Sequence, residues 1–236
     1  MHLNSALRQV FPGLPAQLAD RLAAVSGQQR IGKGSFLFRQ GESPQFVYGL
    51  IEGRISLVTE APGEESIAEF VEPGDVILLP PSLLDLPYMV SAKAMTDLRV
   101  VMIPAADFRQ LSEKVLPLAV LVSRIIARQW RLLLGHLTRT KTQNVAARLT
   151  QYLIDNAGTD TGRAQFALRG TKKDLAAHLG ITPATLSRSL KRLEQLGVAT
   201  SRSEVQIENV ARLKRAIRTR TGRTYKRTRH GKIARP

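Results

Sequence analysis

Residues 171–196 carry helix start and stop signals at a spacing that leaves little freedom of fold. Thr171 is one of the residue types that cap a helix N-terminus. Gly180 can adopt the positive φ that ends such a helix abruptly. Thr182 can cap a second helix, in which Pro183 would occupy the first position, where no backbone N–H is needed. The segment therefore predicts two short helices joined by a tight corner.

The second of these helices, predicted over residues 183–196, has two chemically different faces. One face is a leucine stripe that we expect to be buried: Leu186, Leu190 and Leu193. The opposite face is polar and basic and consists of Thr185, Ser187, Arg188, Lys191 and Arg192. Because residues 165–168 form a predicted strand and residues 198–207 alternate like a β-hairpin, the whole segment predicts a winged helix-turn-helix.

The polar face has the chemistry of a DNA-reading surface. Arginine pairs bidentately with guanine, and a short hydroxyl can approach a base edge or a phosphate. An ordinary helical hairpin with a solvated basic face is the alternative, but the spacing of caps and glycine and the hairpin that follows favour DNA binding. The predicted DNA-binding residues are Thr171, Lys172, Thr182, Pro183, Thr185, Ser187, Arg188, Lys191 and Arg192.

The charge of the chain also indicates a polyanionic partner. The formal net charge is +16 over 236 residues, and such a field attracts DNA, RNA or an anionic membrane surface. About half of the excess lies in residues 218–236, which hold eight Lys or Arg and no acid. We expect this basic tail to be disordered, and either to add non-specific phosphate contacts or to be a solvated extension without function.

Several classes of protein are excluded by what the sequence lacks. Without cysteine there are no disulfides, thiolate zinc sites, iron–sulfur clusters or cysteine nucleophiles. No catalytic triad, glycine-rich phosphate loop or carboxylate pair is recognisable, so we do not expect an enzyme. No apolar run is long enough for a membrane span and residues 1–5 do not resemble a signal peptide, so we expect a cytoplasmic protein without a membrane partner.

A β-rich domain is predicted between residues 30 and 104. Short apolar runs such as residues 36–38 and 98–103 are separated by glycine turns, which is typical of an antiparallel sandwich or jelly roll. Residues 6–27 precede this domain with helical spacing, and residues 105–115 follow it as a short predicted helix.

A long helix is predicted over residues 116–140. Seven positions follow alternating steps of three and four, the spacing of a coiled-coil seam: Leu116, Ala119, Ser123, Ile126, Trp130, Leu133 and Leu137. Another face, which we expect to pack on the protein's own sheet, carries Leu118, Leu121, Val122 and Ile125. Because two apolar faces need two partners, the seam predicts pairing with a second copy of the chain; burial of the whole helix in its own domain is the alternative.

Over residues 10–217 the chain resembles the Crp/Fnr family of bacterial transcription regulators, and regulators of denitrification and anaerobic respiration resemble it most. The segments that carry the resemblance are Phe38 to Glu42, Leu50 to Ile55, Asn144 to Leu149 and Thr171 to Gly197. The resemblance implies an α+β chain with a jelly roll like that of cyclic-nucleotide-binding domains, a long dimerisation helix and a C-terminal winged helix-turn-helix. It also implies three partners, which are double-stranded DNA, a second copy of the chain and RNA polymerase.

Four segments follow from this interpretation. They are a sensory jelly roll (1–115), a dimerisation helix (116–140), a winged helix-turn-helix (141–217) and the basic tail (218–236). The leading hypothesis is a sequence-specific regulator that binds a pseudo-palindromic site as a homodimer. A non-specific architectural DNA-binding protein is the alternative.

The recognition helix departs from the family pattern at one position. The Fnr branch reads DNA with a Glu, a Ser and an Arg along this helix; Ser187 and Arg188 match the last two, while Ala184 stands where the Glu would be. A carboxylate would accept a hydrogen bond from cytosine and alanine cannot. We therefore expect a half-site that differs from the family's usual one, or that is less selective at this base pair.

The jelly roll departs from the family pattern as well. Relatives hold the cyclic phosphate with a Gly-Glu pair and with an Arg followed by Ser or Thr, whereas this chain has Gly74-Asp75, and Tyr88 and Met89 near the Arg and Ser positions. A phosphate would lack a paired cation there, so we expect no cyclic nucleotide. A cupin-type metal site is excluded because residues 3–135 contain no histidine. Haem or another small effector is left open.

Overall fold

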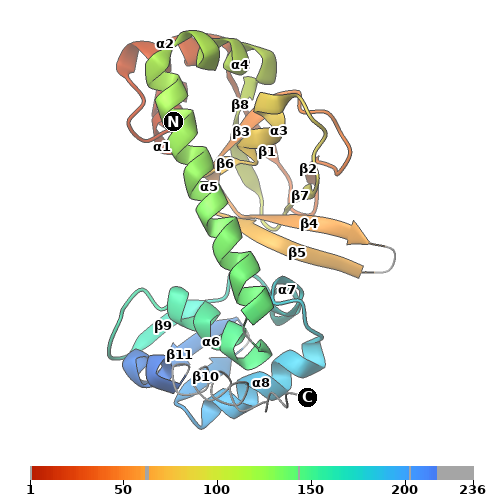
Figure 1. The fold of residues 1–236 in the computed structure, drawn as a ribbon, viewed down its shortest axis with the longest axis vertical. Helices are drawn as coiled ribbons and strands as arrows, with labels where there is room; N and C mark the ends of the chain where they lie inside the picture. Colours follow the sequence, from red (N-terminus) through yellow and green to blue (C-terminus); the bar gives the residue numbers. More distant parts are fainter. Residues whose placement is uncertain (1, 62–63, 143, 202, 217–236) are drawn as a thin grey trace, which may run out of the picture. The chain divides into compact units, whose positions relative to one another are not determined.

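The computed structural model describes residues 2–61, 64–142, 144–201 and 203–216 (Figure 1). The chain forms two compact units, Met1–Leu134 and Gly135–Pro236, and the boundary falls within one long helix. The predicted basic tail, residues 218–236, lies outside the described residues.

Two four-stranded antiparallel sheets make up the β-rich part of the first unit, as far as it is described. One sheet has the order β1-β8-β3-β6, from Gly27–Ile31, Leu98–Pro104, Phe46–Glu52 and Val76–Ile77. The other has the order β2-β7-β4-β5, from Phe36–Phe38, Ser91–Ala94, Ile55–Ala61 and Glu64–Val71. The predicted jelly roll is thereby confirmed.

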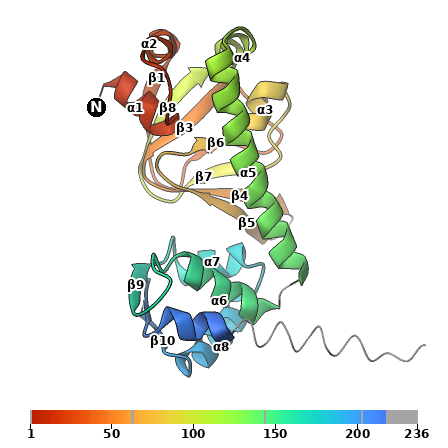
Figure 2. The same cartoon turned by 60° about the vertical axis from the view of Figure 1, so that its left-hand side comes forward.

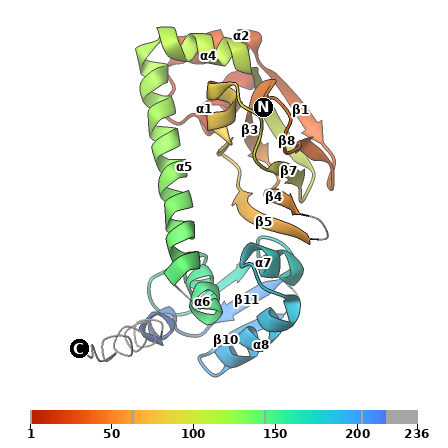
Figure 3. The ribbon, with the colours of Figure 1, turned by 45° about the vertical axis from the view of Figure 1, so that its right-hand side comes forward.

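The helices of this unit are α1 (Leu3–Val10), α2 (Ala16–Val25), α3 (Leu79–Leu84), α4 (Ala105–Lys114) and α5 (Leu116–Thr142). The helical segment expected over residues 6–27 is two helices, and the first begins earlier than expected, at Leu3. Figure 3 shows that α4 leads directly into α5, which starts at Leu116 as predicted. The sequence did not predict α3.

Alternation along the strands separates two cores in this unit. On β8, Leu98 and Val100 face the interior between the two sheets, whereas Val101 and Ile103 face the helices. The helical core includes Phe11, which directly follows α1, stacked on Phe108 of α4, with ring centroids 5.7 Å apart. Burial of these side chains from both directions fixes β8 and its neighbours as the framework of the unit.

As far as it is described, the second unit consists of helices and a small sheet (Figure 2). The helices are α6 (Val145–Asp155), α7 (Lys172–His178) and α8 (Pro183–Glu194), and residues 210–216 are also helical. The sheet has the order β10-β11-β9, from Val198–Ser201, Glu204–Ile207 and Ala164–Ala167. These are the elements of the predicted winged helix-turn-helix.

Candidate nucleic-acid interface

The start of α7 is fixed by a reciprocal pair of hydrogen bonds. The Asp174 amide donates to Thr171 Oγ1 at 3.2 Å, and the Thr171 amide donates to Asp174 Oδ2 at 2.7 Å. This capping box satisfies two donors at the helix end. On the inner side of α7, Leu175 and Ala176 are buried, and the small Ala176 side chain allows α8 to pack closely.

The corner between α7 and α8 depends on Gly180. Its φ is +62°, a left-handed conformation that glycine adopts without steric strain. The chain then turns back, and the Ile181 amide donates to the Ala176 carbonyl at 3.0 Å. Gly180 therefore ends α7 as predicted and sets the direction in which α8 begins.

The beginning of α8 also follows the local signals. Thr182 is extended, its Oγ1 accepts from the Thr185 amide at 3.3 Å, and Pro183 follows as the first helical residue. The predicted leucine stripe is buried and packs in the core of the second unit: Leu186, Leu190 and Leu193. The helix ends at Glu194 rather than at residue 196 because the last turn tightens, with the Gly197 amide donating to the Glu194 carbonyl.

The opposite face of α8 is open to solvent. Of the predicted DNA-binding residues, Thr185 is half-buried and the others are exposed: Thr171, Lys172, Thr182, Pro183, Ser187, Arg188, Lys191 and Arg192. The first turn of α8 contains no acid, and Glu194 is the only acid in the helix. The exposed face is therefore uniformly cationic or neutral near the helix N-terminus, where the partial positive charge of the helix also favours an anion.

Arg188 lies on this face and makes two long hydrogen bonds. Its Nε is 3.4 Å from the Ala184 carbonyl, and its Nη2 is 3.4 Å from Thr185 Oγ1. Both distances are at the long end of the hydrogen-bond range, so the guanidinium can leave them for a base edge or a phosphate at little cost.

A lysine at the start of α7 contacts the wing on this side of the unit. Lys172 Nζ lies 3.3 Å from Thr200 Oγ1, which joins the start of α7 to strand β10. The Leu168 amide donates to the Ser203 carbonyl at 2.6 Å and ties the chain before α7 to the β10–β11 turn. The predicted cation at position 172 therefore sits between helix and wing.

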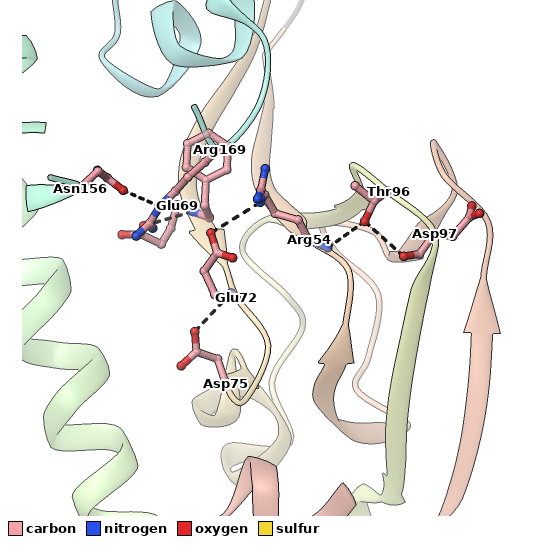
Figure 4. A network of polar contacts seen from close by, with 9 residues as sticks. Arg54, Glu69, Glu72, Asp75, Thr96, Asp97, Asn156 and Arg169 are labelled. Atoms are coloured by element: carbon pink, nitrogen blue, oxygen red, sulfur yellow. Dashed lines mark hydrogen bonds and ion pairs between the residues drawn. The ribbon is translucent and has the colours of Figure 1, made fainter. Parts of the chain in front are cut away.

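Two arginines that sequence reasoning did not single out support the unit from within. Arg148 of α6 donates through Nη2 to the Leu179 carbonyl at 2.8 Å, which orients the end of α7. Arg169 donates through Nε to Asn156 Oδ1 at 2.9 Å (Figure 4). Both contacts join residues distant in sequence, so the only available signal was an arginine at a helix or strand edge.

On α5, the predicted inner face is confirmed. Leu118 and Val122 are buried in the helical core, Leu121 and Ile125 pack partly against it, and Gln129 Nε2 donates to the Val76 carbonyl at 2.9 Å. These contacts fix which side of the helix faces its own sheet.

The seven positions of the predicted seam are not equally exposed. Ala119 is half-buried and Ile126 packs partly against the helical core, whereas Leu116 (74%), Trp130 (63%), Leu133 (59%) and Leu137 (48%) are open to solvent, as is Ser123. A neighbouring row shares four of these positions and is exposed along its whole length: Leu116, Val120, Ser123, Ala127, Trp130, Leu134 and Leu137.

The interior of the jelly roll is occupied by aromatic side chains. Tyr88 is buried and stacks on Phe38 with ring centroids 3.7 Å apart, and its hydroxyl lies 3.4 Å from the Phe46 carbonyl. Burial raises the pKa of Tyr88 to about 12. Met89, in contrast, is 82% exposed. Neither position presents a cation to the interior.

Helix α3, just before Tyr88, is flanked by residues with left-handed backbone conformations and is contacted by an arginine. Leu78 and Asp85 flank it with φ of 42° and 54°, which are left-handed values uncommon for residues other than glycine. Arg109 of α4 donates to the Ser82 carbonyl at 2.7 Å and forms an ion pair with Asp85 at 3.1 Å. The Arg109 guanidinium beside this segment is thus already engaged.

An ion pair of the first unit joins two of its turns. Arg54, between β3 and β4, pairs with Glu72 at 3.5 Å, and its amide donates to Thr96 Oγ1 at 3.0 Å (Figure 4).

Across the described part of the chain, no group of three or more His, Cys, Asp or Glu is arranged to hold a metal ion. Within the same residues, no helix has the length and apolarity needed to cross a membrane.

Comparison with known proteins agrees with this description. The profile of the cyclic nucleotide-binding domain matches residues 28–115, and that of the Crp-like helix-turn-helix domain matches residues 147–216. The chain is 29% identical over 176 residues to the transcriptional activator protein Anr of Pseudomonas aeruginosa, covering 72% of this chain and 71% of that protein. It is 26% identical over 212 residues to the transcriptional regulatory protein Btr of Bordetella pertussis, covering 87% of each. The solved structure of FixK2 from Bradyrhizobium japonicum shares the fold, with a TM-score of 0.71 at 20% identity over 81% of this chain and 96% of that chain.

Proposed function

Because the chain belongs to the Crp/Fnr family of DNA-binding transcription regulators, we propose that it binds a pseudo-palindromic operator as a homodimer, with α8 of each protomer in the major groove. The observation that carries this proposal is the division of α8. A buried leucine stripe fixes the helix, and an exposed face with Ser187, Arg188 and Lys191 remains available for DNA. Acting on chromosomal DNA, it would work in the cytoplasm, with RNA polymerase as a further partner.

A salt titration separates specific regulation from the architectural alternative. Selection from random duplexes should enrich one pseudo-palindromic sequence, and fluorescence anisotropy should then compare it with a scrambled duplex in rising salt. Non-specific binding depends on released counterions and falls steeply with salt, whereas base contacts persist. We expect the selected duplex to remain bound where the scrambled one has dissociated. Equal loss of both would refute specific recognition.

We propose that dimerisation uses the exposed side of α5. Exposed Leu116, Trp130 and Leu137 are apolar side chains at heptad spacing that a second identical helix would cover. These three positions, with Ser123, belong both to the predicted seam and to the neighbouring exposed row, so either row is compatible with them.

Two substitutions distinguish the two rows. Leu134→Glu places a charge in the exposed row, and Leu133→Glu places it in the predicted seam, while both leucines are about equally exposed in one chain. Sedimentation velocity should show dissociation for the variant whose leucine lies in the interface, because an unpaired charge there is costly. Dimers that survive both substitutions would refute pairing through α5.

We propose that the jelly roll does not bind cyclic nucleotides. Residues 73–90 contain no Lys or Arg, Tyr88 fills the interior beside Phe38, and Arg109 is engaged by Asp85. A cyclic phosphate would therefore be desolvated without a paired cation. Titration calorimetry with cAMP and cGMP should give no saturable heat, and saturable binding of either would contradict the proposal. An absorption spectrum of the purified protein tests the haem alternative directly.

A further inference from the structure

The N-terminal end of α8 offers methyl groups and a guanidinium, but no carboxylate. Ala184 is exposed in the first turn, and Arg188 is exposed four residues later. Residues four apart in a helix lie on the same face, one turn from each other. The Arg188 Nε beside the Ala184 carbonyl, at 3.4 Å, shows that the two residues share this face.

The hydroxyls of Thr182 and Thr185, which lie close to Ala184 in the sequence, are engaged within the chain. Thr182 Oγ1 accepts from the Thr185 amide at 3.3 Å and lies 3.0 Å from Thr185 Oγ1. Thr185 Oγ1 is also 3.4 Å from Arg188 Nη2, and its residue is half-buried. At this turn, the exposed Ala184 therefore offers a methyl group, next to the apolar ring of Pro183, which is also exposed.

This chemistry selects among base edges in the major groove. Cytosine and adenine present amino groups, which need an acceptor, whereas thymine presents a methyl group, which packs on an apolar side chain. Guanine presents two acceptors that match a guanidinium. A turn of helix rises about 5.4 Å against a base-pair step of about 3.4 Å, so the two side chains meet bases one or two steps apart.

We propose that Ala184 is a specificity-determining residue that reads a thymine through its C5 methyl group, one or two base pairs from the guanine read by Arg188. This inference rests on the proposed function, since it takes α8 as the helix in the major groove. It adds a defined base contact to each half-site. It also assigns the selectivity to packing of two methyl groups rather than to a hydrogen bond.

Deoxyuridine is the matched probe, because it differs from thymidine only by the missing methyl group. Each thymine of the selected operator is replaced singly, and binding of the full-length protein is measured by anisotropy. At one thymine within two base pairs of the guanine, wild-type protein should lose about three- to fourfold in affinity, the value of one buried methyl group. The other thymines serve as controls and should show smaller changes.

The Ala184→Gly variant completes a double-mutant cycle with the deoxyuridine replacement. It removes the methyl group from the protein, so the same deoxyuridine replacement should have no further effect. Circular dichroism and the melting temperature show whether glycine weakens the helix. If it does, Ala184→Ser supplies a second variant, because serine is favoured at the start of a helix. Repeating the selection with Ala184→Glu should move the preference at this pair from thymine to cytosine.

The outcomes separate the inference from the proposed function. If no sequence is enriched, the proposed function fails. If an operator is found and no thymine near the guanine is sensitive to methyl removal, the inference is wrong and the proposed function stands. A deoxyuridine effect of equal size in wild-type, Gly and Ser proteins would also overturn it, because another side chain would then contact the methyl group.

Discussion

Replacing Arg188 with alanine tests how the exposed face of α8 recognises DNA. The side chain is exposed, and its contacts with the Ala184 carbonyl and with Thr185 Oγ1 are both 3.4 Å long. Because no buried partner is left unsatisfied and alanine is a good helix former, the free energy of unfolding should change by less than about 0.5 kcal/mol. Any larger effect on binding then belongs to the interface.

The binding loss expected for Arg188→Ala is that of a bidentate arginine–guanine pair. Such a pair contributes about 1–3 kcal/mol, which corresponds to a dissociation constant raised about five- to 150-fold. The loss should depend on sequence: wild-type protein should prefer guanine at one position of the half-site, and the variant should bind all four base pairs there with similar affinity.

Anisotropy measurements on the operator, its three variants at that position and a scrambled duplex provide the assay. Lys191→Ala is the matched control, since Lys191 is exposed on the same helix and lies further from its N-terminus. If Lys191 contacts a phosphate, Lys191→Ala should weaken binding to every duplex and lower the salt slope by about one. If Arg188→Ala behaves in this uniform way as well, Arg188 contacts the backbone and the argument for base reading by its guanidinium is wrong.

Three further predictions concern the framework that holds the interface. Thr182→Ala removes the cap bond to the Thr185 amide and should lower stability by about 1 kcal/mol, seen as a lower melting temperature of the second unit in calorimetry; Thr182→Ser should retain it, and equal melting of both variants would show that the cap is not stabilising. Gly180→Ala should cost about 1 kcal/mol, because φ is +62° and an added Cβ meets nothing within 4 Å, so the penalty is backbone strain alone; Gly27→Ala, also in open space and without a positive φ, is the control that should change little. Stability should also fall between about pH 10 and 12, because the pKa of Tyr88 is raised from 10.0 to about 12 and the folded state keeps a proton that the unfolded chain has lost. Urea midpoints measured across this range should fall less steeply for Tyr88→Phe, and parallel profiles would exclude Tyr88 as the cause.

Signals within a few residues predicted the second unit well. Thr171, Gly180, Thr182 and Pro183 act through hydrogen bonds and φ values that each residue type favours on its own. The packing partners of these residues were not needed to place α7 and α8. Arg148, in contrast, donates to the carbonyl of residue 179, and no local pattern specifies a contact over that separation.

Contacts distant in sequence explain what was missed in the first unit. Helix α3 contains two prolines and begins after a leucine at φ 42°, a conformation that only surrounding packing can impose. Leu78 packs toward the interior between the sheets while Leu79 is buried among the helices, so consecutive residues serve two cores. The heptad spacing of α5 likewise fits two adjacent rows, and they differ only in the structure, where Ala119 is half-buried and Ile126 packs against its own core.

The framework of α8 and its recognition chemistry are independent of each other in this chain. The leucine stripe and the caps determine where the helix lies. The leucines point into the core, and the caps lie at the ends of the helix. The exposed positions at Ala184, Ser187 and Arg188 contribute almost nothing to that framework, because their side chains lie outside the core of the unit. Substitutions there can change which operator is bound while stability stays nearly constant. A departure such as alanine in place of a carboxylate is therefore expected to alter the half-site rather than abolish DNA binding.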